Sequence, residues 1–475
     1  MSLDYDLVII GNTPEASYAA LEAVKLKARV AWVLGEKETN TYTEIDRCTF
    51  SYLTQLDKQW QILTKWNLNT QLISNLNLTQ IKYWTNQVKQ DIQEAYSLSN
   101  LASAGVDIIT ESGEFCRLPN LGFIVKNRTL RSRYYLLATG SIFSIPDIEG
   151  LAEVDYLTPE TLELDKLSNN LIIFSQTPAG IELAQNLNRI GKQITLIVEN
   201  HNILPQEDTD AVKLIQSQLE AEGIKLLINC PIIQIKEIDH KKWIQAGNKA
   251  IEADEIILVT NQQPNIKGLN LEGVKVAIKI HRVIVNKKLQ TTNPKIYSFG
   301  NIIREYSLSN IAQYEANIII KNTLFYPFFK VNYKTVPIAI ITNPSLARVG
   351  LTETQARQQY KNDIIIIKQN FNTLSKANIM GETTGFCKII TRRNGIIIGG
   401  HIVGIQSDEL INLIALAMKN NIKIQQLSKI LPPYTAVSNI LFELSRHWQY
   451  QRFKNNKTLN YWLETLLFWR RKWLK

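Results

Sequence analysis

The sequence has 475 residues, 45% of them hydrophobic, and a formal net charge of +10. This length exceeds what one hydrophobic core usually supports, so we expect two or three domains, and the apolar fraction excludes general disorder. The positive charge favours an anionic partner, and charge alone does not choose among nucleic acid, acidic lipid and an acidic protein. No segment resembles a nucleic-acid-binding module, so we expect no nucleic acid partner.

Two further features restrict location and chemistry. The first residues, MSLDYDLVII, pass straight into a strand-like segment without a signal-peptide pattern, and no run of about 18 apolar residues follows. We therefore expect a cytoplasmic protein without a spanning helix. The four cysteines lie far apart, which disfavours a disulfide framework and a structural zinc site, and we predict no metal.

Strand-like and helix-like segments alternate from the start of the chain. The apolar run DLVIIG precedes PEASYAALEAVKLKA, whose apolar residues recur at helical spacing. The same order returns in LIIFSQTPAGIELAQNLNRIGKQITLIVEN. This repetition predicts two nucleotide-type units with parallel sheets, the second inserted into the first.

The pattern changes near Tyr333. From there to about Leu431, short β-branched runs mix with one helix-like stretch, which predicts an α+β domain. The last segment, from about Arg446, places tryptophan and leucine residues on one helical face and basic residues at its end.

Five landmarks occur in the order found in a known enzyme family. They are a turn at Gly11, LLATGS at Leu136–Ser141, a second turn at Ser175–Gly180, IYSFGN at Ile296–Asn301, and PSLARVGLTE. By these motifs the chain resembles the class I pyridine nucleotide-disulfide oxidoreductases, which include dihydrolipoamide dehydrogenase, glutathione reductase and mercuric reductase. The resemblance extends over essentially the whole chain up to the basic tail.

The resemblance implies an α/β fold with two Rossmann-like FAD/NAD(P)-binding domains, the second inserted in the first, plus a C-terminal α+β dimerisation domain. The expected divisions are an FAD-binding domain at 1–150 and 271–332, an NAD(P)-binding-like domain at 151–270, a dimerisation domain at 333–445 and a basic amphipathic tail at 446–475. Because the third domain builds the dimer interface in this family, a homodimer is expected.

The first turn, GNTPEA, stands where the family has GxGxxG. A glycine at the second position lets the backbone approach a pyrophosphate, and the helix N-terminus supplies amide donors; Thr13 narrows this approach without closing it. The family's ribose-binding acid falls at Leu34, with Glu36 two positions later. The resemblance implies FAD, with candidate contacts at Gly11, Thr13, Pro14, Ala16, Glu36, Thr139, Gly140, Gly300 and Asn301. Alternatively, these turns persist in a sheet that binds no flavin.

The second turn has lost more of the family pattern. Ser175 and Thr177 replace the first two glycines, Gly180 remains, and Glu199 lies one residue beyond the expected acid position. The family's GRxPN loop appears as NQQPN, without the arginine. Two alternatives therefore stay open. Either NAD(P)H binds through Thr177, Gly180 and Glu199, or the second lobe has only a structural role.

The catalytic elements of the family are incomplete. Alignment to CxxxxCxxSK places Thr43 and Cys48 at the two cysteines, Ser51 at the serine and Tyr52 at the lysine that would pair with Glu182. Cys48 is the candidate catalytic residue for single-thiol chemistry, with a half-buried inert thiol as the alternative. No histidine occurs in ILPPYTAVSNIL, where the family's histidine and glutamate belong, and we expect a structural role for the strand residue His401.

Two functional classes follow. The first is an FAD-dependent oxidoreductase without the redox-active cysteine pair, acting with an unknown redox partner or small-molecule substrate. The second is a non-catalytic pseudo-oxidoreductase that serves as a membrane-associated scaffold or assembly factor. The C-terminal helix has three possible uses: binding an anionic membrane surface, docking on a partner protein, or packing back on the dimer.

Overall fold

The computed structural model describes residues 3–35, 44–65, 78–117, 120–304, 308–454 and 457–473. The chain forms two compact units. The first comprises Met1–Ile203 with Gly223–Val331, and the second comprises Leu204–Glu222 with Asn332–Lys475.

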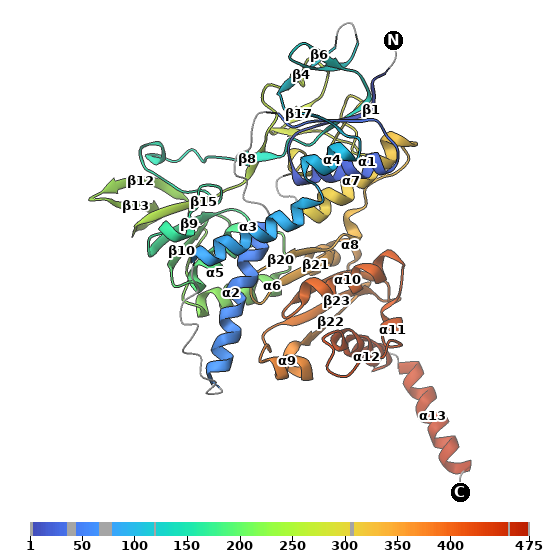
Figure 1. The fold of residues 1–475 in the computed structure, drawn as a ribbon. Helices are drawn as coiled ribbons and strands as arrows, with labels where there is room; N and C mark the ends of the chain where they lie inside the picture. The colour runs from blue at the N-terminus through green and yellow to red at the C-terminus, as the bar shows by residue number, and fades with distance from the viewer. Residues whose placement is uncertain are drawn as a thin grey trace. The chain divides into compact units, whose positions relative to one another are not determined.

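The first lobe of the first unit is built on a parallel five-stranded sheet in the order β19-β7-β1-β2-β3. Figure 1 shows β1 of this sheet with helices α1 and α7 beside it. In β1, Leu7 and Ile9 contact the core under the helices, whereas Val8 and Ile10 pack on the other face, as period-two alternation requires. The strands are β1 (Tyr5–Ile10), β2 (Val30–Val33), β3 (Asp107–Ile109), β7 (Ser132–Leu137) and β19 (Ile296–Ser298). The helices of this part are α1 (Pro14–Lys25), α2 (Glu44–Lys65), α3 (Leu78–Glu94), α4 (Leu98–Ser103) and α7 (Ser309–Leu324).

The second lobe contains a parallel four-stranded sheet in the order β11-β10-β9-β15. Its elements are β9 (Asn170–Ser175), α5 (Pro178–Arg189), β10 (Gln193–Val198), β11 (Lys225–Ile228) and β15 (Glu255–Val259). Because β19 returns to the first sheet after β15, the second lobe is inserted in the first. The two Rossmann-like domains are thus confirmed.

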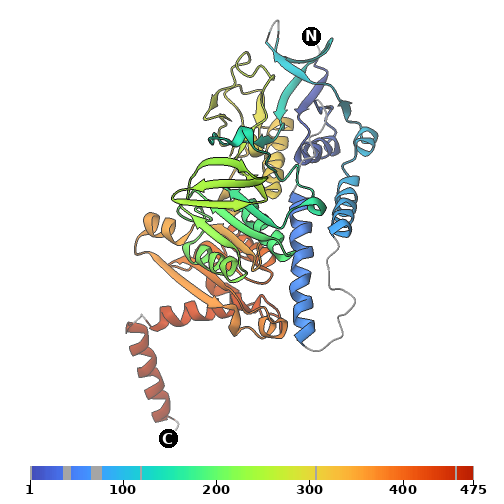
Figure 2. The same cartoon turned by 90° about the vertical axis from the view of Figure 1, so that its left-hand side faces the viewer.

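Smaller antiparallel sheets complete the first unit. Figure 2 shows the three-stranded sheet of the second lobe in light green: β12 (Ile232–Ile238), β13 (Lys241–Ala246) and β14 (Lys249–Ala253). The others are β4 (Gly113–Cys116), β5 (Gly122–Val125) and β6 (Arg128–Leu130), then β8 (Ser141–Phe143) with β16 (Gln262–Pro264), and β17 (Ile278–Lys279) with β18 (Arg282–Val283).

The second unit has an antiparallel five-stranded sheet in the order β20-β21-β24-β23-β22, which confirms the α+β third domain. The strands are β20 (Ile338–Ile340), β21 (Leu346–Gly350), β22 (Ile364–Asn370), β23 (Phe386–Arg392) and β24 (Ile397–Val403). The helices are α6 (Thr209–Ala221), α8 (Glu353–Tyr360), α9 (Ser375–Met380), α10 (Ser407–Lys419), α11 (Ile424–Leu427), α12 (Asn439–Lys454) and α13 (Lys457–Trp473).

The predicted tail start at residue 446 falls inside helix α12. Trp448 in this helix is 1% exposed, belongs to the core of the second unit, and donates from its indole nitrogen to the Thr391 hydroxyl at 2.9 Å. The exposed amphipathic helix of the sequence analysis is α13, which begins at Lys457.

One buried ammonium group holds α6 and α8 to the sheet of the second unit. The side chain of Lys388 in β23 is 3% exposed, and its Nζ lies 2.7 Å from Asp208, 2.9 Å from Asp210 and 3.0 Å from Glu353. The Asp208 side chain is itself 1% exposed. A buried charge is tolerated when such partners surround it.

We expect Lys388→Met to lower the free energy of unfolding by about 3–5 kcal/mol, because it removes the cation beside a buried carboxylate. The hydrogen bond from Lys388 lowers the pKa of Asp210 below its ordinary value. A lowered pKa stabilises the folded state above an ordinary aspartate pKa of about 4, and this contribution is lost as the pH falls below it. In urea unfolding, the free energy of unfolding should therefore fall more steeply with decreasing pH for the wild type than for Lys388→Met.

Lys368→Met is the matched control for this prediction. Lys368 also contacts Asp210, at 3.1 Å, but its side chain is 41% exposed. An exposed pair contributes at most about 1 kcal/mol. Equal losses for the two variants would contradict the structural importance of the buried ammonium group.

Candidate functional site

The first βα turn requires glycine at Gly11. Its φ is +121°, and a Cβ built there would lie 2.3 Å from the carbonyl oxygen of Ala138 at the end of β7. The Gly11 amide donates to the carbonyl of Val33 at 2.8 Å, and its carbonyl accepts from the indole of Trp32 at 2.8 Å. The turn is therefore fixed against the ends of β2 and β7, at the carboxyl edge of the sheet where α/β proteins bind ligands.

Helix α1 begins directly at this turn. Thr13 is its N-cap, with the hydroxyl accepting from the amide of Ala16 at 3.2 Å, and Pro14 occupies the first helical position. Ala16 is fully buried. A Cβ on Gly140 would lie 2.8 Å from the Thr13 methyl carbon, so Thr13 packs against Gly140 and fills the space that a second glycine would leave.

Two carboxylates that the sequence analysis did not single out lie at the starts of α1 and α2. Burial raises the pKa of Glu15, and Glu44 raises it further, whereas hydrogen bonds from Ser309 and Thr13 oppose the shift. The backbone amide of Ser309, the first residue of α7, donates to Glu44 at 2.7 Å. The beginnings of three helices therefore meet beside the turn.

Asn301, one of the candidate FAD contacts, is held by its side-chain amide nitrogen. That nitrogen donates to the hydroxyl of Ser141 at 3.0 Å and to the side-chain oxygen of Gln262 at 2.6 Å. Gly300 precedes it with φ +70°, and its amide donates to the buried Glu315 at 2.8 Å. The sequence analysis assigned Gln262 to the loop of the second lobe, but the structure brings its side chain to Asn301.

Two oxygen atoms at this edge have unused hydrogen-bonding capacity. The side-chain oxygens of Asn301 and Thr139 are buried and have no hydrogen-bond partner among the described residues. A buried oxygen without a donor costs about 1–3 kcal/mol, and the asparagine oxygen can only accept. The hydroxyls of a ribityl chain supply such donors, and the Thr139 hydroxyl can in turn donate to a diphosphate oxygen, so these residues fit the ribityl diphosphate part of FAD.

The remaining candidate for the FAD site is not placed by the structure. Glu36 lies outside the described residues. Leu34, at the expected acid position, is half-buried, and its amide donates to the carbonyl of Ile109 at 2.8 Å.

The second turn is closed by a side chain. The hydroxyl of Ser175 accepts from the amide of Thr177 at 3.2 Å and donates to the carbonyl of the same residue at 2.9 Å. A Cβ on Gly180 would lie 2.1 Å from this hydroxyl oxygen, which explains why glycine is kept there. The carboxylate of Glu199 accepts from Gln176 at 2.9 Å. The Thr177 amide, which could bind the diphosphate of NAD(P)H, therefore already has Ser175 as its hydrogen-bond partner.

The pairing of Glu182 differs from the sequence expectation. The Glu182 side chain in α5 is 0% exposed, and its carboxylate lies 3.1 Å from the guanidinium of Arg47 in α2, which is 6% exposed. Tyr52, at the family's lysine position, is 52% exposed. Sequence analysis missed Arg47, although Arg47 and Ser51 are four residues apart and thus share a helix face.

The thiol of Cys48 follows Arg47 in α2 and is half-buried, and no disulfide joins any of the four cysteines. Further along α2, the hydroxyl of Ser51 accepts from the side-chain nitrogen of Asn186 at 2.7 Å. The hydroxyl of Thr54 donates to the side-chain oxygen of the same asparagine at 2.8 Å. Thr43, at the family's first cysteine position, lies outside the described residues. Helices α2 and α5 lie side by side (Figure 1). Among the described residues, the contacts that join them include the ion pair and these two hydrogen bonds.

In the second unit, His401 lies in β24 as expected and is fully buried. Its Nε2 is 2.9 Å from the carbonyl oxygen of Leu351, and burial lowers its pKa. No group of three or more His, Cys, Asp or Glu in the described ranges could hold a metal ion. None of the described helices is long and apolar enough to cross a bilayer.

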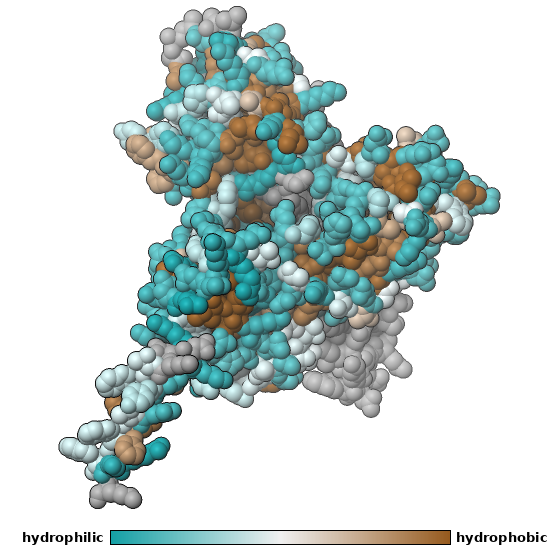
Figure 3. All heavy atoms as spheres, turned by 180° about the vertical axis from the view of Figure 1, so that it is seen from behind, coloured by the Kyte–Doolittle hydropathy of each residue, from teal (hydrophilic) through white to brown (hydrophobic). Residues whose placement is uncertain are grey.

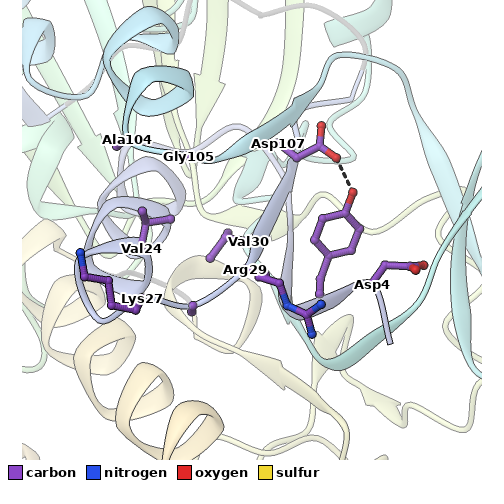
Figure 4. A pocket seen from close by; sticks show the side chains of 10 residues that line it. Asp4, Val24, Lys27, Arg29, Val30, Ala104, Gly105 and Asp107 are labelled. Carbon is purple, nitrogen blue, oxygen red and sulfur yellow. Dashed lines mark hydrogen bonds between the residues drawn. The ribbon is translucent and has the colours of Figure 1, made fainter. Parts of the chain in front are cut away.

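A separate hollow of about 380 Å³ lies at the amino edge of the first sheet (Figure 4). Tyr5 donates there to Asp107, and burial with this hydrogen bond raises the pKa of Tyr5 to about 12. Arg128 also contacts the Asp107 carboxylate, at 2.7 Å. Because parallel sheets bind ligands at their carboxyl edge, this hollow is not the candidate cofactor site.

Two parallel nucleotide-type lobes and an antiparallel third domain define the architecture of the flavin- and nicotinamide-linked reductases. Residues 5–316 match the family described as pyridine nucleotide-disulphide oxidoreductase, and residues 336–443 match the dimerisation domain of that family. The chain belongs to the pyridine nucleotide-disulphide oxidoreductase family, as the sequence motifs indicated.

Curated relatives are similar over most of the chain. Mercuric reductases of Bacillus cereus and Staphylococcus aureus are 28% and 29% identical, over 92% of this chain and 70% and 81% of their own lengths. A dihydrolipoyl dehydrogenase of Bacillus subtilis (strain 168) is 26% identical over 93% of this chain and 98% of its own.

Solved structures share the fold. The HOCl-induced flavoprotein disulfide reductase RclA of Escherichia coli superposes with a TM-score of 0.81 at 21% identity, covering 94% of this chain and 100% of its own. LpdA of Mycobacterium tuberculosis gives a TM-score of 0.83 at 23% identity, covering 93% and 99%.

Proposed function

We propose that this protein is an FAD-dependent oxidoreductase that does not use the dithiol exchange of its family. The observation that carries the proposal is the pair of buried oxygens on Asn301 and Thr139 that lack donors beside the Gly11 turn. In the proposed site, the residues that hold FAD are Gly11, Thr13, Pro14, Ala16, Thr139, Gly140, Gly300 and Asn301.

Bound FAD would supply hydride and electron transfer. The chain's own contribution would be positioning: Gly11 and Thr13 would hold the diphosphate, and the side-chain oxygen of Asn301 would accept a hydrogen bond from a ribityl hydroxyl. In the proposed arrangement, Arg47 replaces the family's lysine as the cation that neutralises the buried Glu182 carboxylate.

The purified protein should be yellow, with a flavin-to-protein ratio near one. Asn301→Leu removes the acceptor, so we expect roughly tenfold weaker flavin binding, whereas Asn301→Asp keeps an acceptor and should retain it. Flavin content after denaturation measures both. A colourless but folded wild type, or unchanged binding in Asn301→Leu, would refute the proposal.

The electron donor in this proposal is a reduced redox protein or a quinol in place of NAD(P)H. It rests on the second turn, where the hydroxyl of Ser175 already accepts from the Thr177 amide. Anaerobic mixing should reduce the flavin with dithionite but only slowly with NADH or NADPH. Fast reduction by either nucleotide would instead support a nucleotide site at Thr177, Gly180 and Glu199.

Cys48 is the proposed catalytic thiol. Cys48→Ser should reduce turnover with a disulfide or peroxide substrate to background, because the hydroxyl is a far weaker nucleophile than a thiolate. Cys116→Ser, at another half-buried cysteine, should leave turnover unchanged. Equal turnover in Cys48→Ser and the wild type would reject a catalytic role for this thiol.

The second candidate function is a non-catalytic scaffold of the same fold. It is favoured by the segment ILPPYTAVSNIL, in which no histidine stands where the family's base belongs. Both candidate functions include a homodimer, because residues 336–443 match the dimerisation domain. Light scattering of the full chain measures the dimer, and absence of flavin with an intact dimer would favour the scaffold.

A further inference from the structure

Helix α13 presents a stripe of large apolar side chains that no other described part of the chain covers. Trp462, Leu466, Trp469 and Trp473 recur at spacings of four, three and four residues, which places them on one helix face. Their exposed fractions are 66%, 58%, 64% and 87%. Figure 3 shows α13 at its lower left, with brown and pale side chains beside teal ones. An exposed apolar stripe of this kind is typical of an interaction surface.

Positive charge is concentrated in the same segment. Residues 446–475 contain eight lysines and arginines and one glutamate, so they carry +7 of the formal net charge of +10. Arg470, Arg471 and Lys472 are exposed beside the last tryptophan, and the Lys472 ammonium lies 4.8 Å from the ring of Phe468. Tryptophan prefers the headgroup layer of a bilayer, and basic side chains bind acidic headgroups.

Helix α12, which precedes α13, is packed on the second unit instead. Trp448 of α12 is 1% exposed in the core of the second unit, and the dimerisation-domain match ends at residue 443. Helix α13 therefore lies C-terminal to the region that matches the family. It has 17 residues with three basic side chains in its last turn, which suits a helix lying along a lipid surface better than one crossing it.

We propose that α13 binds an anionic lipid surface, with Trp462, Leu466, Trp469 and Trp473 inserted between headgroups and the basic residues paired with acidic lipids. The positive charge of this segment favours an anionic lipid surface over an apolar protein groove as the binding site of α13. An apolar groove of about 540 Å³ between α10 and α12 is lined by Leu413, Leu416, Ile430 and Phe442 and offers no acidic side chain.

The test is sedimentation of the full-length protein with phosphatidylcholine vesicles, with and without phosphatidylglycerol. Binding should require phosphatidylglycerol and fall with added salt. The triple variant Arg470→Gln, Arg471→Gln, Lys472→Gln should bind on the order of a hundredfold more weakly, since each basic residue contributes a factor of about five. Trp462→Ala with Trp469→Ala should also lose most binding.

A second exposed aromatic cluster supplies the matched control. Tyr326 and Phe328 are 69% and 74% exposed, with stacked rings 5.8 Å apart. Tyr326→Ser with Phe328→Ser removes similar exposed aromatic surface and should leave vesicle binding unchanged. Equal binding to both vesicle types, or no binding, would overturn the proposal.

Removal of residues 455–475 distinguishes lipid from a second copy as the occupant. Under the proposal, the truncated chain keeps the oligomeric state and the flavin content of the full chain but no longer sediments with vesicles. A change of oligomeric state on truncation, with vesicle binding absent in the full chain, would show that α13 packs on another copy instead.

Discussion

Gly11→Ala is expected to lower the free energy of unfolding by about 3 kcal/mol or more and to abolish flavin binding. The new Cβ would lie 2.3 Å from the carbonyl oxygen of Ala138, in a backbone conformation that side chains rarely adopt. Ala138 cannot retreat easily, because its amide donates to the carbonyl of Ile10 at 2.7 Å. Denaturant unfolding and flavin content together measure the two effects.

Gly191→Ala separates the clash from the conformational strain. Gly191 also has a positive φ, +90°, but a Cβ there would meet no atom within 4 Å. Its replacement should therefore cost about 1 kcal/mol and leave flavin content intact. If the two variants behaved alike, the packing of the first turn against β7 would not be the reason for glycine at Gly11.

Arg47→Met should destabilise the first unit by about 3–5 kcal/mol, because it takes the guanidinium away from a carboxylate that is 0% exposed. Arg47→Lys keeps a positive charge and should lose less. Thermal and urea unfolding of the three proteins measure the difference.

The double variant Arg47→Met with Glu182→Leu completes the cycle. Removing both charges should recover most of the lost stability, since an apolar pair of similar volume is often as stable as a buried ion pair. A double variant as unstable as the sum of the single variants would contradict direct coupling between Arg47 and Glu182.

The order of landmarks along the sequence was sufficient to predict the fold, because each motif ends a strand or begins a helix of a known architecture. The turn at Gly11 lies at the end of β1, where the motif order placed it. The partner of Glu182 did not, because motif alignment points to Tyr52, whereas the contact is decided by which face of α2 packs on α5. Arg47 and Glu182 are far apart in sequence, and only the tertiary structure brings them within 3.1 Å.

Side-chain hydrogen bonds were equally difficult to predict. The motif comparison indicated only that Ser175 replaces a glycine. In the structure, its hydroxyl accepts from the amide of Thr177 and donates to the carbonyl of the same residue. The sequence pattern predicted Trp448 as part of an amphipathic tail, but its side chain is buried and donates to the hydroxyl of Thr391. Composition and periodicity do not distinguish a tryptophan that fills a core from one that faces solvent, because that difference depends on the neighbouring elements.

Helix α5 connects two regions that are usually considered separately. Its N-cap, Thr177, belongs to the nucleotide turn of the second lobe, and Glu182 lies about 7.5 Å further along the same helix. Asn186, one turn later, is bonded to α2. Because one helix carries all three residues, the turn of the second lobe, the buried Arg47–Glu182 ion pair and the Asn186 contacts to α2 are parts of a single continuous element.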